Sequence, residues 1–253
     1  MKAMLDVQNV EKYYGNKGNI TKALDNLSFQ VGKGEFISIM GASGSGKTTL
    51  LNCISTIDST SAGNIYLDGA DITKLKDEEL AKFRRENLGF IFQDFNLLDT
   101  LTIGENISLS LTVNGLLSNE VTDRINNISS QLGIAHILNK FPYQVSGGEK
   151  QRCACARAVI TNPKLVLADE PTGSLDSVSS QKLLEIMADL NRTLTSTILM
   201  VTHDALSASY ADRILFLKDG KIFNEIIKGE KRRQTFYHEI LDVLSLLGGT
   251  ASC

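Results

Sequence analysis

One stretch of the chain has the residue types and the spacing of a phosphate-binding loop. It consists of Gly41, Ala42, Ser43, Gly44, Ser45, Gly46, Lys47 and Thr48. Glycines allow the backbone to curl so that successive N–H groups point inward at phosphate oxygens. In such a loop the lysine reaches the β- and γ-phosphates of a nucleotide, and the hydroxyl that follows it holds Mg²⁺. The spacing therefore predicts a site for a nucleoside triphosphate with its magnesium ion.

The segments on both sides of this loop supply the context that the motif requires. Residues 36–40 are apolar and rich in β-formers, and Thr49 opens a helical stretch that runs to residue 54. A helix that begins at the loop adds the positive end of its dipole at the same point. A glycine-rich turn with an exposed lysine is the alternative, which the strand–loop–helix order disfavours. We include Thr49 among the nucleotide-binding candidates.

Residues with acid–base chemistry follow two other apolar segments. Residues 165–168 lead into Asp169 and Glu170, and residues 197–201 lead towards His203. Paired carboxylates at the end of a buried strand are costly unless a cation or a reacting group faces them. We expect Asp169 on the magnesium side and Glu170 at an attacking water. A lone histidine is more often structural than catalytic, but ligand sites of α/β folds lie at strand carboxyl ends.

A second turn with two glycines opens another helix. Ser146 and Glu149 have the three-residue spacing of a capping box, in which each side chain bonds to the backbone N–H of the other. Gly147 and Gly148 lie between them and leave N–H groups for an anion at a helix start. The pattern is compatible with a purely structural cap and with an anion site, and both can hold together.

Two adjacent aromatic residues, Tyr13 and Tyr14, precede a turn-rich segment at residues 15–19. An aromatic ring at this place would stack on the face of an adenine base. A tyrosine packed on the edge of a strand is the alternative interpretation, and the residues alone leave both open.

The composition excludes several classes of protein. The 253 residues carry a net charge of −3, so no basic excess points to nucleic acid or anionic lipid as a partner. No apolar run approaches the roughly 18–20 residues that span a bilayer, and the first residues lack the apolar core of a signal peptide. Four cysteines suggest no disulfide framework and fit a reducing cytoplasm. Cys153 and Cys155 are expected to be small packing residues rather than metal ligands.

The order of predicted elements indicates an α/β fold with two additions. Residues 5–14 and 23–31 are expected to form antiparallel strands, and residues 102–159 a helical insertion between two core strands. A hairpin is expected over residues 214–227. In the tail, Phe236, Ile240, Leu244 and Leu247 recur on one helix face. We expect this face to dock on the body of the protein, and a second copy or a partner is the alternative.

The motif order resembles that of the nucleotide-binding subunit of an ABC transporter. Residues 41–48 match the Walker A loop, and Gln93 matches the Q-loop glutamine that ligates Mg²⁺ and senses the γ-phosphate. Residues 145–149 match the family signature, normally Leu-Ser-Gly-Gly-Gln, but depart from it at Val145 and at Glu149. Glu149 places an extra carboxylate near the phosphate site of an opposing subunit.

Four further positions match functional residues of the family. The resemblance makes Asp169 the Walker B aspartate, Glu170 the catalytic glutamate, Asp176 the D-loop aspartate and His203 the switch histidine. It also makes Tyr14 the A-loop aromatic, in preference to Tyr13.

The resemblance implies the fold of a P-loop NTPase, an ABC-type nucleotide-binding domain with a RecA-like core, an antiparallel β subdomain and an inserted α-helical subdomain. It implies a domain over residues 1–228, with the helical subdomain at about 97–160, and a tail over 229–253. It further implies a cytoplasmic ATPase that binds ATP and Mg²⁺ as a head-to-tail homodimer. The dimer would be peripheral on the inner face of the membrane, with a permease docked near residues 93–98.

A narrower resemblance concerns residues 39–43, 92–99 and 233–236, which are similar to those of bacitracin- and nisin-type peptide-resistance ATPases. These work with a ten-helix permease and often report to a sensor kinase, and macrolide-export and lipoprotein-releasing ATPases are related. The alternative is an ATPase that drives a peptide-sensing or lipoprotein-releasing permease without net transport. DNA-repair relatives carry long heptad arms that this sequence lacks, so no nucleic-acid partner is expected.

Overall fold

Apolar segments form a six-stranded sheet at the centre of the fold. The computed structural model describes residues 3–16, 18–115 and 118–248. The strands of this sheet are β3 (Phe36–Met40), β6 (Leu88–Ile91), β7 (Leu165–Asp169), β8 (Ile198–Val201), β9 (Arg213–Lys218) and β10 (Lys221–Ile227). Their order is β10-β9-β3-β8-β7-β6, and all neighbours are parallel except the hairpin of β9 and β10. The α/β class and the hairpin expected from the sequence are therefore confirmed.

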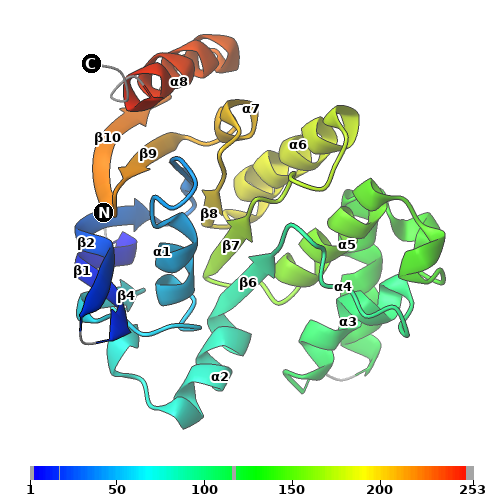
Figure 1. The fold of residues 1–253 in the computed structure, drawn as a ribbon. Coiled ribbons are helices and arrows are strands. Elements are labelled where there is room, and N and C mark those ends of the chain that lie inside the picture. Colours follow the sequence, from blue (N-terminus) through cyan, green and yellow to red (C-terminus); the bar gives the residue numbers. More distant parts are fainter. Residues whose placement is uncertain (1–2, 17, 116–117, 249–253) are drawn as a thin grey trace.

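The parallel arrangement brings three strand ends to one edge of this sheet. β3 pairs with β8, and β8 pairs with β7, so their carboxyl ends lie side by side. Figure 1 labels the neighbouring strands β8 and β7. Each strand leads into a feature that the sequence analysis singled out: the phosphate-binding loop directly after β3, Glu170 directly after β7, and His203 two residues after β8. Strands that are buried along their length, such as β3 and β8, fix these segments in place.

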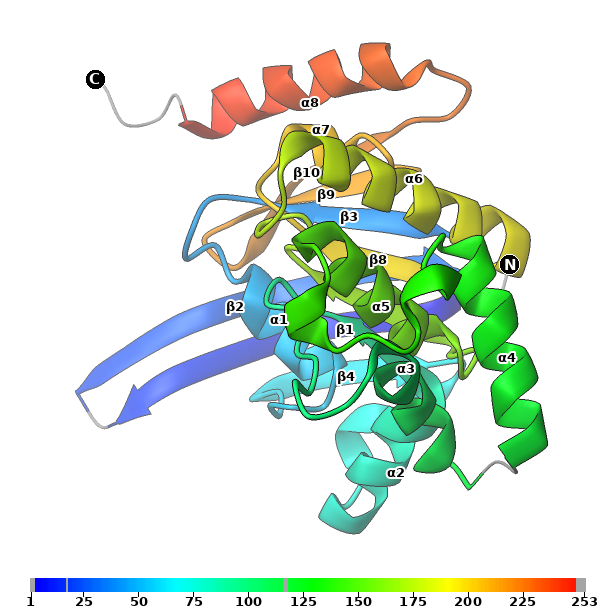
Figure 2. The same ribbon diagram turned by 90° about the vertical axis from the view of Figure 1, so that its right-hand side faces the viewer.

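A second, antiparallel sheet covers one side of this core. It contains β1 (Ala3–Asn16), β2 (Asn19–Gly32), β4 (Ala62–Leu67) and β5 (Ala70–Asp71), in the order β2-β1-β4-β5. Its apolar side chains form one cluster with those of α1 (Lys47–Ile54) and of β3, β7, β8 and β9. The β1–β2 hairpin extends away from the body (Figure 2). Gly15 pairs with Ile20, so the two strands continue into the segment expected to be a turn.

Helices cover the other side of the six-stranded sheet. Between β6 and β7 the chain forms α3 (Ile103–Thr112), α4 (Ser118–Gln131) and α5 (Gly147–Val159), and after β7 it forms α6 (Ser177–Leu194). Side chains of α3, α5 and α6 share one apolar cluster with β6, β7 and β8. The expected helical insertion is thus present (green in Figure 1). Shorter or peripheral helices are α2 (Asp77–Asn87), α7 (Ala205–Ala208), η1 (Ile72–Lys74), η2 (Ala135–Ile137) and η3 (Pro142–Gln144).

The tail forms α8 (Arg233–Gly248), which packs on the body as expected. Phe236 and Ile240 are fully buried, and they share a cluster with residues of α7, β3 and β9. Leu244 and Leu247 contact this cluster and are only partly buried. Val243, which the sequence analysis did not select, is also buried there. The apolar stripe of the tail is therefore directed onto side chains of β9, β3 and α7.

The structure shows the surroundings of two cysteines and the character of the helices. Cys153 and Cys155 are buried free thiols in α5, as expected for packing residues. Across residues 3–16, 18–115 and 118–248, no helix has the length and apolar character needed to cross a membrane.

The packing of α8 predicts unequal effects for two substitutions in the same helix. Phe236→Ala removes a fully buried ring and should lower the free energy of opening α8 by roughly 3 kcal/mol. Leu246→Ala is the matched control, because Leu246 is 63% exposed. Amide hydrogen exchange of α8 measures both. Equal protection in the two variants would contradict the docking of this helix.

Candidate functional site

The phosphate-binding loop leads into α1 through a glycine that no other residue can replace without strain. Gly46 has a φ of 102° and is the N-cap of α1. A Cβ at Gly46 would lie 2.5 Å from the carbonyl oxygen of Ala23. No side chain of the described residues caps α1, and no acidic residue lies in its first turn. The first N–H groups of α1 are therefore directed at the loop and suited to an anion.

Lys47 lies within this loop. Its Nζ donates to the carbonyl oxygens of Gly41 at 2.8 Å and of Ala42 at 2.9 Å. Burial lowers the pKa of the Lys47 ammonium, and the nearby charges of Glu170 and Asp169 oppose this effect. A cation surrounded by loop carbonyls and acids is placed to neutralise phosphate charge.

The loop opens onto a cavity of about 760 Å³. The residues that line it are Ala23, Ala42, Ser43, Gly44, Gly46, Lys47, Thr48, Thr49, Glu170 and His203. The Ser45 hydroxyl, in the same loop, is buried and makes no hydrogen bond within the described part of the chain. An unpaired buried hydroxyl and free helix-start amides fit a bound phosphate chain. The structure thus brings the loop, the acid and the histidine to one cavity.

Glu170 and His203 are held in direct contact. A Glu170 carboxylate oxygen lies 2.8 Å from Nδ1 of His203, and the other accepts the Thr202 hydroxyl at 3.0 Å. The backbone of Glu170 is left-handed, with a φ of 44°. Thr202 was missed by the sequence analysis, although its place at the end of an apolar strand could have indicated it. This contact fixes the carboxylate at the edge of the cavity.

The three residues expected to supply oxygen ligands to Mg²⁺ follow or end three strands of the sheet, β3, β7 and β6. Asp169 is half-buried at the end of β7, where burial and then the charge of Glu170 raise its pKa while Lys47 lowers it. Thr48 lies in the first turn of α1. The Gln93 side chain packs against Gly173, since a Cβ there would lie 2.9 Å from Gln93 Cδ. One carboxylate with neutral oxygens suits Mg²⁺ that also binds phosphate.

The signature segment is held by its own capping box. The Ser146 hydroxyl accepts from the Glu149 N–H at 3.4 Å, and the Glu149 carboxylate accepts from the Ser146 N–H and hydroxyl, each at 2.8 Å. These bonds lower the pKa of Glu149. The other carboxylate oxygen of Glu149 lies 3.4 Å from His136 Nε2. The carboxylate that departs from the family pattern is therefore turned back onto its own helix.

Several predicted site residues do not line the cavity of the phosphate-binding loop. They are Tyr14, Gly41, Ser45, Gln93, Ser146, Gly147, Gly148, Glu149, Asp169 and Asp176. Asp176 caps α6, because its carboxylate accepts from the N–H groups of Val178 and Ser179. The signature segment and the phosphate-binding loop are thus separate surfaces of one chain.

Two residues of α5 that the sequence analysis missed connect the signature helix to the segment around Gln93. Gln151 donates to the carbonyl oxygens of Phe92 at 3.0 Å and Pro171 at 2.6 Å. Arg157 donates to the carbonyl oxygen of Phe95 at 2.9 Å. The residue types carried no signal for these bonds, because the acceptors are backbone carbonyls. Gln151 is fully buried, so its amide requires such partners.

This fold and this loop define a P-loop ATP-binding protein. A family model described as "ABC transporter" matches residues 24–173. The ABC transporter ATP-binding protein YxdL of Bacillus subtilis (strain 168) is 53% identical, over 100% of this chain and 97% of the relative. The bacitracin export ATP-binding protein BceA of Halalkalibacterium halodurans is 49% identical, over 98% of this chain and 98% of the relative. The chain belongs to the ABC transporter family as an ATP-binding subunit with ATPase activity.

A solved structure supports the same assignment. The dimeric structure of a post-hydrolysis state of the ATP-binding cassette MJ0796, bound to ADP and Pi, superposes with a TM-score of 0.80. It is 39% identical and covers 88% of this chain and 98% of that chain. The corresponding protein of Methanocaldococcus jannaschii is 42% identical over 88% of this chain. The RecA-like core with its antiparallel β subdomain and helical insertion, expected from the resemblance, is thus confirmed.

The capping box of α5 predicts that Glu149 acts mainly on its own helix. Glu149→Ala should lower the free energy of unfolding by about 1 kcal/mol at neutral pH, because it removes an acceptor from the helix start. Glu149→Gln should retain most of the cap. Since the pKa of Glu149 is lowered on folding, its charge contributes stability above the ordinary value of 4.5, and this is lost as the pH falls through the lowered value. Urea unfolding of both variants tests this, and an unaffected Glu149→Ala protein would contradict it.

Proposed function

We propose that this subunit hydrolyses ATP between two copies of the chain and thereby drives a membrane permease. The supporting observation is the separation of the signature segment from the cavity that contains Lys47, Glu170 and His203. A single chain therefore presents two half-sites on different surfaces. Two copies in a head-to-tail arrangement would place the Ser146 end of α5 against the phosphates held by the other copy. The dimeric structure of the MJ0796 cassette supports this proposal by analogy.

In the proposed site the residues of one copy have distinct tasks. Lys47 and the amides of the phosphate-binding loop bind the β- and γ-phosphates. Thr48, Gln93 and Asp169 would hold Mg²⁺, which supplies charge neutralisation at the phosphates. Glu170 orients or deprotonates the attacking water, and its contact with His203 keeps the carboxylate at the cavity. Tyr14 stacks on the adenine base.

The role of Glu170 predicts a separation of binding from turnover. Glu170→Gln should retain ATP binding, lower turnover by about 10²–10⁴-fold and accumulate an ATP-bound dimer. Steady-state hydrolysis and size-exclusion chromatography with ATP measure the two effects. Glu78→Gln is the control, because Glu78 is an exposed acid of α2. Turnover near that of the control would refute the role of Glu170.

Lys47 should act on binding itself. Lys47→Ala removes the ammonium that lies in the loop and should weaken ATP binding by more than tenfold, since a charge-assisted contact to phosphate is lost. Equilibrium titration with ATP measures the dissociation constant. An unchanged constant would contradict phosphate binding by this loop.

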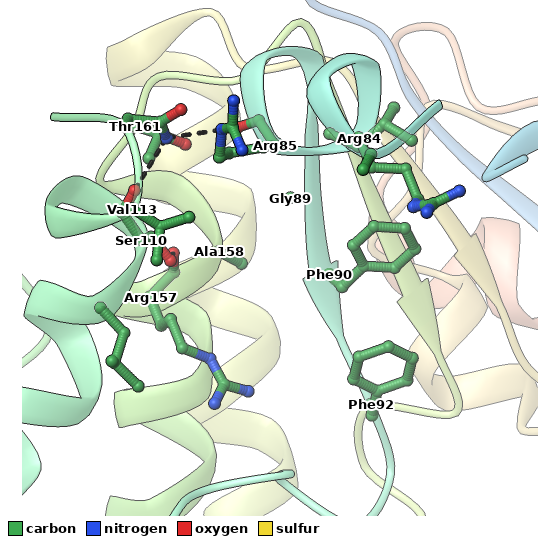
Figure 3. A pocket seen from close by; sticks show the side chains of 14 residues that line it. Arg84, Arg85, Gly89, Phe90, Phe92, Ser110, Val113, Arg157, Ala158 and Thr161 are labelled. Carbon is green, nitrogen blue, oxygen red and sulfur yellow. Dashed lines mark hydrogen bonds between the residues drawn. The ribbon is translucent and has the colours of Figure 1, made fainter. Parts of the chain in front are cut away.

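A groove beside the segment of Gln93 is the proposed docking site for the permease. A cavity of about 610 Å³ lies between α2 and β6 on one side and α3 and α5 on the other (Figure 3). Phe90 and Phe92 are stacked in it with ring centroids 5.5 Å apart. Its charged lining residues are Arg84, Arg85 and Arg157, and none is acidic. Aromatic rings with arginines fit an apolar helix that carries acidic residues.

A substitution at Val113, directly after α3, tests this docking surface. Val113 is 60% exposed on the groove wall, so Val113→Asp should abolish co-purification with the membrane partner and leave the ATPase activity of the isolated subunit unchanged. Ile227→Asp is the matched control, because Ile227 is 59% exposed on β10, outside the groove. Retained co-purification of the Val113 variant would rule out this groove as the docking site.

The transported molecule is proposed from the relatives. The relation to a bacitracin export ATP-binding protein supports a role in resistance to antimicrobial peptides, with the subunit on the cytoplasmic face of the membrane. The permease would in that case respond to a bacitracin- or nisin-type peptide and would also act on a sensor kinase. Peptide efflux by the purified complex tests the role in transport.

The proposed domain boundaries are residues 1–228 for the nucleotide-binding domain, about 97–160 for its helical subdomain and 229–253 for the tail.

A further inference from the structure

A charged pair fixes the hydroxyl end of Tyr14. The Tyr14 hydroxyl donates to Asp58 Oδ2 at 2.7 Å, although the two residues are 44 positions apart. The other oxygen of Asp58 accepts from Lys12 Nζ at 2.5 Å. Lys12 is only 7% exposed, and its ammonium also donates to the Ser59 carbonyl oxygen at 2.6 Å. The acceptor of the Tyr14 hydroxyl is thus itself held by a buried cation.

The same cation lies over the Tyr14 ring. Lys12 Nζ is 5.0 Å from the ring centroid, within the range of a cation–π contact. Lys12 and Tyr14 are two positions apart on β1, so they project from the same face of the strand. Tyr14 nevertheless remains 42% exposed. Its ring is therefore held by the hydroxyl and by a cation while a large part of its surface is open.

The hydroxyl end of Tyr14 lies next to the cavity of the phosphate-binding loop. Burial, and then the Asp58 carboxylate, raise the pKa of the Tyr14 hydroxyl, while a hydrogen bond with Thr49 opposes the shift. Thr49 is in turn one of the residues that line the cavity. The Tyr14 hydroxyl thus interacts with a residue that lines the cavity where a nucleotide's phosphates would bind.

We propose that Asp58 and Lys12 are positioning residues that fix the Tyr14 ring in the orientation that receives the base of a bound adenine nucleotide. The inference rests on the proposed stacking of Tyr14 and adds to it what sets the ring's orientation. An exposed tyrosine without such partners samples several rotamers and loses that freedom when a base binds. The hydroxyl bond and the cation remove this freedom before the nucleotide arrives, so they increase affinity for the base without touching it.

The test compares two ligands that share their phosphates and differ in the nucleoside. ADP and inorganic pyrophosphate would both occupy the phosphate-binding loop, and only ADP has a base. Calorimetric titration of the full chain with each ligand is carried out for the wild type, Tyr14→Ala, Tyr14→Phe and Asp58→Asn. Tyr13→Phe is the matched control, because it removes a hydroxyl that bonds to Glu11 instead of Asp58.

Tyr14→Phe keeps the aromatic ring and loses only the anchor. It should weaken ADP binding by about three- to tenfold, the effect of one hydrogen bond, and leave pyrophosphate binding unchanged. Asp58→Asn should weaken ADP binding in the wild-type background and have no further effect in the Tyr14→Phe background. In steady-state hydrolysis, Tyr14→Phe and Asp58→Asn should each raise KM for ATP and leave kcat unchanged.

Different outcomes would contradict the stacking of Tyr14 on the base and the positioning of its ring by Asp58 and Lys12. If Tyr14→Ala binds ADP as tightly as the wild type, the proposed stacking is wrong. If Tyr14→Ala weakens ADP binding and Tyr14→Phe does not, stacking holds and the positioning role is wrong. Equal losses for ADP and pyrophosphate in Tyr14→Phe, or additive losses in the double variant, would also overturn the positioning role, since they indicate a general disturbance of the fold.

Discussion

The parallel register of β3, β8 and β7 is the constraint on which the site depends. Ile39 pairs with Val201, and Val201 pairs with Asp169, so the three strands end level with one another. The phosphate-binding loop, the acid and the histidine then emerge at one edge, although the loop is more than a hundred residues from the other two in the chain. A slip of one residue would turn each side chain to the opposite face of the sheet. The buried apolar side chains on both faces prevent such a slip.

This arrangement requires an unfavourable backbone conformation at Glu170. Its backbone is left-handed, which for a residue other than glycine costs of the order of 1–3 kcal/mol. Hydrogen bonds from its N–H to the Val201 carbonyl oxygen, and from the Gly173 N–H to its own carbonyl, hold this conformation. The conformation separates the directions of two adjacent acids. Asp169 stays half-buried near Lys47, and Glu170 reaches Thr202 and His203.

The sequence predicted the parts of the structure that local spacing determines. The phosphate-binding loop, the cap at Ser146 and Glu149, the strand that ends in Asp169 and the docked face of α8 all follow from residues close together in the chain. In each case a periodicity or a short fixed spacing carries the signal.

Contacts between distant segments could not be predicted in this way. Gln151 and Arg157 bind backbone carbonyls about 60 positions away, and backbone acceptors leave no trace in the residue types. The bond between Tyr14 and Asp58 likewise joins two segments through a tertiary contact alone. The β1–β2 hairpin is longer than expected because strand pairing continues through a glycine-containing segment.

We propose that one chain contributes half of each of two ATP sites and that a second copy supplies the other half of each. Mixing two inactive variants tests it most directly, one with Glu170→Gln and the other with Ser146→Arg. In a head-to-tail dimer of the two, both substitutions fall in one site and the other site is intact. The mixture should therefore show ATPase activity well above that of either variant alone. A mixture that forms dimers and shows no recovery would contradict the shared site.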